Sequence, residues 1–429
     1  MPATDPARRP SSPCRPSIPE SASLDPAPGE AAVAVLLAKF ADIPGPRAAG
    51  GILHPLPGVL LCALFAVISN CESYTAMATF AETQLEWLRR YIPLLHGAPS
   101  HDTFRYVFML LQPAALTDIL CAWAGPLDGQ HVRIDGKVSR GAKDTETGRS
   151  RLWLLRAWVS DAGLSVAHAP CGEKSSEQAT FPALLASLQL KGALVTIDAM
   201  AGHPEIARLL HEGGAGYILA LKANEKETHT LVAAHFKHLS GQNEHPPAGR
   251  EDATELFAPE IMPAHWAAPC DVSMTTEMNR GRWEERQVIA IAAGPWLPKA
   301  FLWYGLQSAV CVLRRTMRQR QSAAAPAWEV HYYLTSLPPG AAKLGASIRA
   351  HWGVENSCHH LLDVTFGEDH SQVRDATAAQ SLSLLREMAA ALLRKHPRKG
   401  SVKAKRVRAA LSQEFRAEVV AANFDNLHA

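Results

Sequence analysis

The pattern of apolar and polar residues divides the chain into a helical first part and a mixed second part. From about residue 33 to residue 125, apolar side chains recur every three or four positions, and Pro and Gly separate the runs. The helical spacing is clearest in VAVLLAKFADI, GVLLCALFAVI, YTAMATFAETQLEWLRRYI and DTFRYVFMLL. This pattern predicts a small helical domain, with Ser100 or Asp102 as the N-cap of its last clear helix.

Short strand-like runs begin near residue 130. Strands are predicted at 131–138, 151–160, 163–170, 193–200 and 217–222, and helices at 181–190 and 204–213. Strands that alternate with helices are typical of a mixed α/β sheet. Three more strand-like runs, 282–292, 307–317 and 328–337, lie between polar and Pro-rich loops. They predict a β-rich insertion at about 223–336.

The two ends of the chain differ from this pattern. Residues 1–32 are rich in Pro, Ser and Ala, and their low apolar content predicts a disordered tail. After the insertion, apolar spacing predicts two amphipathic helices that complete a domain running from 130 to 395. Residues 396–429 begin with HPRKGSVKAKRVR and are expected to form a basic tail.

Composition excludes several classes of protein. The chain has 429 residues, 47% of them hydrophobic, and 43 Lys and Arg against 41 Asp and Glu, so overall charge indicates no partner. Its eight cysteines are scattered without a Cys-x-x-Cys pair, which disfavours a structural zinc site and a disulfide framework. No stretch has the length of a membrane span or the pattern of a signal peptide. We therefore expect a cytoplasmic protein.

A glutamate stands on an apolar helical face near the end of the chain. Helical spacing places six side chains on one side of a predicted helix: Leu344, Ile348, Trp352, Glu355, His359 and Leu362. An unpaired buried carboxylate costs several kcal/mol or takes up a proton. Some other group must therefore neutralise Glu355.

Two aspartates follow strand-like runs and could lie near that glutamate. They are Asp135 in VRIDGK and Asp198 in LVTIDAM, and α/β sheets place their chemistry at strand ends. Asp135-Gly136 also fits a hairpin turn, which is a structural alternative. With Glu355, the aspartates supply hard oxygen ligands suited to Mg²⁺ or Mn²⁺. Two such ions about 4 Å apart support in-line displacement at phosphorus, so the inferred chemistry is phosphodiester transfer.

Two other interpretations of Glu355 remain open at this point. His351, Glu355 and His359 are spaced four apart and could contribute to a zinc site, although the spacing differs from His-Glu-x-x-His. Alternatively, Glu355 could form a structural salt bridge with Arg349 or Arg386.

Three motifs in order resemble the DDE transposases of the H-repeat-associated insertion-sequence family. They are IDGKVSRGAKD, VTIDAMAGHPEIARLLHEGGAGYILALKANE and IRAHWGVENSCHHLLDVTFGEDHSQVRDATAAQSLSLLREMA. DIPGPR and PSHDTFRYVF also resemble the family's N-terminal associated domain, here at 33–125. The resemblance implies a ribonuclease H-like catalytic core with a β-rich insertion. It assigns the catalytic and metal-binding triad to Asp135, Asp198 and Glu355.

Further residues within the matching motifs become candidates for holding DNA phosphates or ordering the carboxylates. They are Lys137, Arg140, Lys222, Asn224, His351 and Trp352. For Lys137 and Arg140, a solvated strand end is an alternative. The basic tail adds four candidate DNA contacts, Lys403, Lys405, Arg406 and Arg408.

The resemblance implies a transposase that uses Mg²⁺ or Mn²⁺, with two ions, to cut DNA at the ends of an element and join the freed 3′-hydroxyl to target DNA. Its partner would be double-stranded DNA, at the nucleoid and without a membrane. Pairing two element ends implies a homodimer or larger assembly. A nuclease of the same fold without strand transfer, and a DNA-binding remnant that does not cleave, are the alternatives.

Overall fold

The structure is a computed structural model. It describes residues 29–45, 52–138, 153–159, 162–171, 177–198, 202–222, 225–241, 266, 269–279, 281–318, 328–353 and 358–422. Three of the candidate residues, Arg140, Asn224 and Glu355, lie outside these ranges, as does most of the predicted disordered tail.

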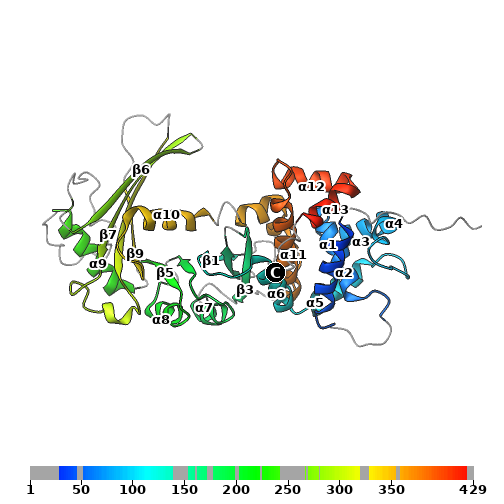
Figure 1. Cartoon of the computed structure of the whole chain (residues 1–429), viewed down its shortest axis with the longest axis horizontal. Coiled ribbons are helices and arrows are strands. Elements are labelled where there is room, and N and C mark those ends of the chain that lie inside the picture. The colour runs from blue at the N-terminus through cyan, green and yellow to red at the C-terminus, as the bar shows by residue number, and fades with distance from the viewer. Residues whose placement is uncertain are drawn as a thin grey trace, which may run out of the picture.

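Six helices precede the sheet in the described residues, and the first five form a unit at one end of the molecule, on the right of Figure 1. They are α1 (Glu30–Ala41), α2 (Leu56–Ile68), α3 (Tyr74–Thr83), α4 (Leu85–Leu88), α5 (His101–Leu110) and α6 (Pro113–Ala124). Helix α2 is its core, because nearly all of its residues are buried. Ser100 caps α5 by accepting a hydrogen bond from the backbone N–H of Thr103, as one of the two predicted caps.

Helix α1 begins at Glu30, inside the predicted tail of residues 1–32. Within that tail, Ala32 is buried against the rest of the helical unit, as is Val33, the first residue of the predicted helical domain. The tail prediction is therefore wrong for these last residues, because their apolar side chains join the pattern of α1.

Among the described residues no single helix is long and apolar enough to cross a membrane, although α5 and α6 pass that test together across a bend of 83°.

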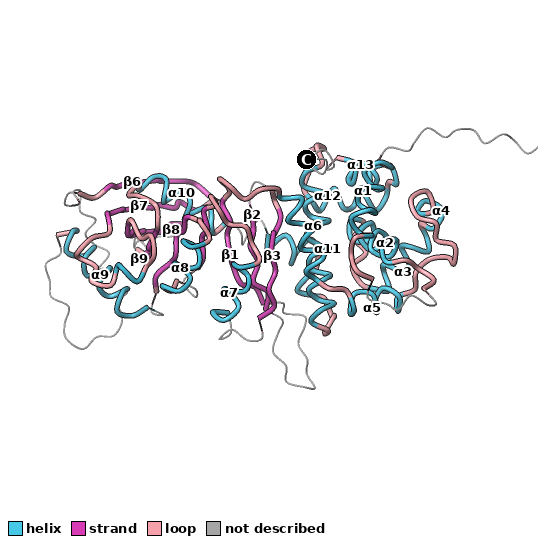
Figure 2. The backbone as a smooth tube through the Cα atoms, turned by 60° about the horizontal axis from the view of Figure 1, so that its bottom comes forward, coloured by secondary structure: helices cyan, strands magenta, loops and turns pink. Residues whose placement is uncertain are grey.

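The rest of the fold is built on one mixed sheet of nine strands. They are β1 (His131–Val138), β2 (Trp153–Val159), β3 (Leu164–Cys171), β4 (Leu194–Ile197), β5 (Gly216–Leu221), β6 (Asp271–Asn279), β7 (Arg282–Ala292), β8 (Ser308–Arg318) and β9 (Glu329–Thr335). Their order is β3-β2-β1-β4-β5-β9-β8-β7-β6 (Figure 2). Among the strand pairs of the described residues, β1–β4 and β4–β5 are parallel and the others are antiparallel.

The segment predicted as a β-rich insertion extends this sheet. Strand β9 pairs antiparallel with β5, and β8, β7 and β6 continue outward from it. Strand β7 has the predicted limits, whereas β6 was not predicted. The segment also contains α9 (Lys226–Leu239), a helix that the sequence analysis missed.

Helices cover both faces of the sheet. Helices α7 (Glu177–Ala186), α8 (Pro204–Glu212) and α9 share the large core with one face, whereas α10 (Ala341–His351) packs on the other (Figure 1). Gly345 permits the close approach of α10, because a Cβ there would lie 2.8 Å from a methyl group of Val288.

The predicted apolar stripe is not one continuous buried face. Leu344 and Ile348 are buried on α10, and Leu362 is buried in the π-helical segment η7 (Leu361–Thr365). Trp352 is 38% exposed, because α10 ends at His351. The stripe prediction is therefore wrong for Trp352.

Helix α11 (Ala376–Lys395) connects the two parts of the molecule. It contacts α2 and α5 of the helical unit and β3 of the sheet, and lies between them in Figure 1. Almost all of its residues from 378 to 393 are buried, including the charged pair Arg386 and Glu387. Because the helix is buried on all sides, each of these charges needs a partner of opposite charge inside the protein.

The predicted basic tail folds into two helices, α12 (Val402–Leu411) and α13 (Gln413–Ala421). Helix α12 packs on α11 and α2, and α13 packs on α1. The Nζ of Lys405 donates to the carbonyl oxygens of Leu393 and His396, each at 2.8 Å. Cations suit this position because the last carbonyls of a helix lack partners within the helix.

Arg406 is only 1% exposed and donates to the carbonyl oxygen of Val67 at 2.8 Å. It also pairs with Glu72. The prediction that Lys405 and Arg406 bind DNA phosphates is therefore wrong, since the fold occupies both groups. Lys403 and Arg408 are exposed and are not affected by this correction.

Glu72 supports the contact between the helical unit and α11–α12, because it pairs with Arg406 and with Arg386 Nε, the latter at 3.2 Å. Glu72→Gln should lower the free energy of unfolding by about 3 kcal/mol, since it leaves two buried guanidinium groups short of a carboxylate. Urea denaturation measures this loss.

The exposed pair of Glu86 with Arg89 provides the control. Glu86→Gln should change stability by less than about 1 kcal/mol. Equal effects of the two substitutions would contradict the role given to Glu72.

Candidate active site at the carboxyl ends of β1 and β4

The parallel pairing of β1 and β4 brings two candidate aspartates together. Ile134 is the register partner of Ile197, so Asp135 and Asp198 each follow a paired residue. Neighbouring strands lie about 4.8 Å apart, and residues at equivalent positions point to the same face. The register therefore directs the two aspartates to the same face of the sheet, at the ends of neighbouring strands.

Asp135 does not form the hairpin turn considered from its sequence. Strand β1 continues to Val138, and Asp135 and Gly136 pair with Arg156 and Leu155 of β2. The alternative of an Asp-Gly turn is therefore wrong. The parallel pairing of β1 with β4 ends at Ile134, whereas the antiparallel pairing of β1 with β2 continues to Val138. Asp135 is therefore the first residue of β1 beyond its pairing with β4.

Each aspartate has a nitrogen group close by. Asp135 accepts a hydrogen bond from the backbone N–H of Gly136 at 2.8 Å, and its other oxygen lies 3.5 Å from Nδ1 of His359. Burial lowers the pKa of His359 to about 3, and Arg156 and Lys137 add to the shift. His359 is thus a neutral ring beside Asp135 that can donate from Nδ1. The Nζ of Lys222 lies 3.6 Å from Asp198.

A chain of three side chains attaches the end of α10 to β4. Thr196 Oγ1 lies 3.0 Å from Nδ1 of His351 and 2.9 Å from Nε2 of His131. Burial lowers the pKa of both histidines to about 4, so both rings are neutral near neutral pH. His351 therefore holds the last turn of α10 against Thr196 of β4. Thr196 lies two residues before Asp198 in the chain.

A small cleft lies beside Asp198. Its walls include Tyr333 of β9 and Ile348, His351 and Trp352 at the end of α10. The Trp352 indole donates a hydrogen bond to the Tyr333 hydroxyl. The chain thus leaves α10 over the face that carries Asp198, three residues before Glu355, which is outside the described residues.

A buried network of charges lies next to Asp135, and sequence reasoning missed it. Arg156, the register partner of Asp135, is 1% exposed. It donates to Glu368 at 2.8 Å, and its Nε lies 3.0 Å from Glu387 of α11. His168 of β3 also contacts Glu387 at 3.0 Å. The available signal was an arginine within the apolar run WLLRAWV, since a charge in a buried strand requires a partner.

The charges of this network shift one another. Burial alone would lower the pKa of Arg156, but Glu368 and Glu387 raise it above its ordinary value. Burial alone would raise the pKa of Glu368, but Arg156, Lys137 and Arg386 hold it well below its usual range. Arg156 and Glu368 are therefore both ionised at neutral pH.

Lys137 belongs to this network. Its Nζ lies 3.1 Å from Glu368 and 4.0 Å from Asp369, and it also pairs with Asp363. Its side chain is only 10% exposed. The predictions of a DNA-phosphate contact and of a solvated strand end are both wrong for Lys137, because three carboxylates already surround it.

The other interpretations of Glu355 meet competing contacts. Arg349 pairs with Glu277, and Arg386 pairs with Glu72, so each arginine has another carboxylate partner. His351 and His359 are engaged with Thr196 and Asp135. In the part of the chain that the structure describes, no three His, Cys, Asp or Glu residues are grouped as a metal site.

The donor set nevertheless suits a hard divalent cation. Asp135 and Asp198 are partly exposed, on neighbouring strands, and offer carboxylate oxygens of the kind that Mg²⁺ and Mn²⁺ prefer. Two carboxylates at this spacing also repel each other, and a bound cation would relieve that repulsion.

Comparison with known proteins gives matches over most of the chain. Residues 37–124 match the family described as DDE_Tnp_1-associated, and residues 120–393 match the family described as Transposase DDE domain. The putative transposase YncI of Escherichia coli O157:H7 is 29% identical over 392 residues, covering 90% of this chain and 94% of that protein.

Other relatives match to a similar extent. The H repeat-associated putative transposase YhhI of Escherichia coli K12 is 28% identical and covers 90% of this chain and 97% of its own length. An uncharacterized protein of Xanthobacter autotrophicus is 33% identical over 64% of this chain and 87% of its own. A solved piggyBac transposase complex with hairpin DNA gives a TM-score of 0.38 at 9% identity, over 90% of this chain and 78% of the other.

The buried network predicts a specific pH dependence. Because the folded pKa of Glu368 is depressed, its stabilisation is present above its unfolded pKa of about 4.3 and is lost as pH falls below that value. Glu368→Gln should lower the free energy of unfolding by about 3 kcal/mol at neutral pH. Denaturation at a series of pH values should show this difference shrinking below about pH 4.

Glu205→Gln is the control, because Glu205 forms an exposed pair with Arg208 on α8. It should have little effect at any pH. A difference between Glu368→Gln and the native protein that stays constant into acid would contradict the ionised network.

Proposed function

The chain belongs to the Transposase DDE domain family, and from that premise we propose that Asp135, Asp198 and Glu355 are the metal-binding carboxylates of its active site. The protein is a transposase, a class of enzyme that cleaves DNA. One observation carries the assignment of residues. The β1–β4 register brings two aspartates that are far apart in sequence to adjacent positions on the same sheet face.

The strand order supports a ribonuclease H-like core as part of this proposal. Strands β1, β2 and β3 form an antiparallel meander, and β4 and β5 add in parallel on the other side of β1. Helix α8 makes the crossover between β4 and β5. The extension by β9, β8, β7 and β6 falls between β5 and α10, where the resemblance places an insertion before the glutamate.

The attachment of α10 supports Glu355 as the third carboxylate. His351 binds Thr196, and Trp352 binds Tyr333, so two contacts fix the end of α10 beside Asp198. Glu355 follows these residues within one helical turn's length of chain. If Glu355 joins the two aspartates, bound cations would neutralise the negative charge of the three carboxylates on this face.

The three carboxylates would hold Mg²⁺ or Mn²⁺, as the two ions that the family resemblance implies. Held by these carboxylates, such ions would supply activation of an attacking oxygen and charge stabilisation of the leaving oxygen at phosphorus. The protein's own groups orient the ligands. Nδ1 of His359 lies 3.5 Å from one oxygen of Asp135, and the backbone N–H of Gly136 donates to the other, while Lys222 lies beside Asp198.

The proposed reaction is cleavage of double-stranded DNA at element ends, followed by attack of the freed 3′-hydroxyl on target DNA. Lys222, Trp352, Lys403 and Arg408 are exposed and remain proposed DNA contacts, along with Arg140 and Asn224. Because two ends must be joined in one event, we propose that a homodimer or larger assembly acts on DNA.

The proposal predicts that Asp198→Asn and Glu355→Gln abolish strand cleavage while DNA binding persists, since each keeps the side-chain shape and removes a charge needed for the ions. Gel assays of nicked and joined products, beside a binding titration, measure the two properties. Glu205→Gln should behave as the native protein, because its pair with Arg208 is exposed on α8. Cleavage that survives in either active-site variant would overturn the assignment of that residue.

Metal addition gives an independent readout. Mg²⁺ or Mn²⁺ at saturating concentration should raise the melting temperature of the native protein, because a ligand that binds only the folded state stabilises it. The rise should be lost in Asp198→Asn. Without metal, this variant should be as stable as the native protein or more so, since it has one repelling charge fewer. A retained metal response would show that the ions bind elsewhere.

A further inference from the structure

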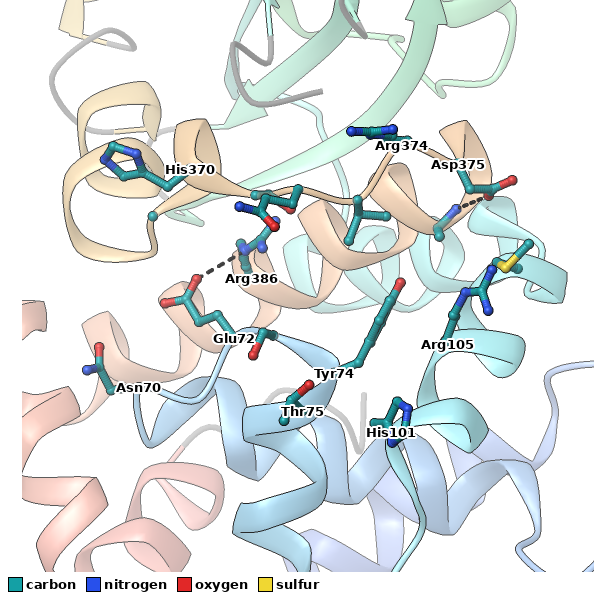
Figure 3. A pocket seen from close by; sticks show the side chains of 17 residues that line it. Asn70, Glu72, Tyr74, Thr75, His101, Arg105, His370, Arg374, Asp375 and Arg386 are labelled. Carbon is teal, nitrogen blue, oxygen red and sulfur yellow. Dashed lines mark hydrogen bonds and ion pairs between the residues drawn. The ribbon is translucent and has the colours of Figure 1, made fainter. Parts of the chain in front are cut away.

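A large cavity lies away from the aspartates, between the helical unit and the start of α11. Its volume is about 710 Å³, and it is partly open to solvent. The walls come from the loop between α2 and α3, from the start of α3, from α5, from the segment 367–375 and from α11 (Figure 3). We call it the α5–α11 cavity. A volume of this size is within the range of ligand-binding pockets.

The carboxylates of the cavity wall are already paired. Glu72 binds Arg386 and Arg406, and Asp375 caps α11 by accepting from the backbone N–H of Ala378 at 2.8 Å. Their charges are therefore directed at groups of the fold. They do not compensate the remaining cations of the wall.

Two arginines of the wall, Arg105 of α5 and Arg374 before α11, are exposed and have no carboxylate partner among the described residues. His101 and His370 also line the cavity. The helical unit and the segment before α11 therefore each offer a guanidinium group, and guanidinium groups match phosphate oxygens in geometry and charge.

The Tyr74 hydroxyl adds a neutral donor. It is buried in the wall and lacks a hydrogen-bond partner within the described residues, although buried hydroxyl groups are normally paired. Burial raises the pKa of Tyr74 above its ordinary value, so the hydroxyl keeps its proton. Figure 3 shows the ring rising from α3 toward α11, between Glu72 and Arg105.

We propose that the α5–α11 cavity binds the DNA backbone, with Arg105 and Arg374 each contacting one phosphodiester and the Tyr74 hydroxyl as a neutral donor. This inference rests on the proposed function for the identity of the ligand. The cavity itself is defined by its own residues, none of which belongs to the proposed triad. A phosphate ester could also come from a free nucleotide, so the experiment must separate the two sources.

The main experiment measures binding to a short mixed-sequence duplex at several salt concentrations. Arg105→Gln and Arg374→Gln should each reduce the slope of log K against log salt by about 0.9, because each removes one phosphate contact. Arg398→Gln is the matched control, since Arg398 is exposed beyond the far end of α11, a helix about 30 Å long. An unchanged slope in both cavity variants would overturn the proposal.

Tyr74→Phe separates a ligand contact from a structural one. It should weaken DNA binding about tenfold and leave the salt slope unchanged, because the lost donor is neutral. Thermal stability should stay the same or rise, since the substitution removes a buried hydroxyl without a partner. A fall in stability with native DNA affinity would assign the hydroxyl to the fold and contradict its role here.

Thymidine 5′-monophosphate tests the other source. DNA backbone binding predicts that this nucleotide, at concentrations that saturate ordinary nucleotide sites, neither displaces the duplex nor raises the melting temperature. Tight binding of the nucleotide that is lost in Arg105→Gln would replace DNA by a free phosphate ester.

Failure of this proposal differs from failure of the proposed function. Asp198→Asn tests the active site through cleavage with intact binding, whereas the cavity variants test binding and its salt slope with the triad intact. Loss of cleavage in Asp198→Asn alongside native binding in both arginine variants would retain the transposase site and reject the cavity.

Discussion

Buried charge around α11 is the constraint on which the arrangement of the molecule depends. An ion removed from water is tolerated only when it is paired, so each buried charge fixes the position of its partner. Toward the sheet, Glu387 and Glu368 bind Arg156 beside Asp135. Toward the helical unit, Arg386 binds Glu72, which also binds Arg406 of α12. The same helix therefore holds the sheet, the helical unit and the C-terminal helices together.

The sequence predicted helices, strands and caps well where the apolar residues followed a single clear spacing. Strands at 131–138 and 282–292 and the Ser100 cap are confirmed, because alternation and capping are properties of adjacent residues. The two aspartates were identified from their positions after strand-like runs, and the register places them together. Glu355 stays a prediction, since it lies outside the described residues.

Sequence reasoning failed where a charge took its role from a distant partner. Lys405 and Arg406 belong to a basic run in the sequence. In the fold, Lys405 donates to the carbonyl oxygen of Leu393 and Arg406 to that of Val67. Lys137 looked like a solvated or DNA-binding residue, but Glu368, far along the chain, holds it. Local composition cannot distinguish a solvated cation from one that neutralises a buried carboxylate, because the difference lies in tertiary pairing.

The segment from Gly367 to Asp375 relates the proposed active site to the α5–α11 cavity. On its sheet side, Glu368 holds Lys137 of β1 and Arg156 of β2, the strands that carry and flank Asp135. The rest of the segment lines the cavity and ends at the cap of α11. A short stretch of chain, fixed at its start by buried ion pairs and at its end by a helix cap, has little freedom to move. DNA held in the cavity would therefore lie at a fixed distance from the aspartates. Phosphate binding in the cavity would then determine which phosphodiester bond of the DNA reaches the carboxylates.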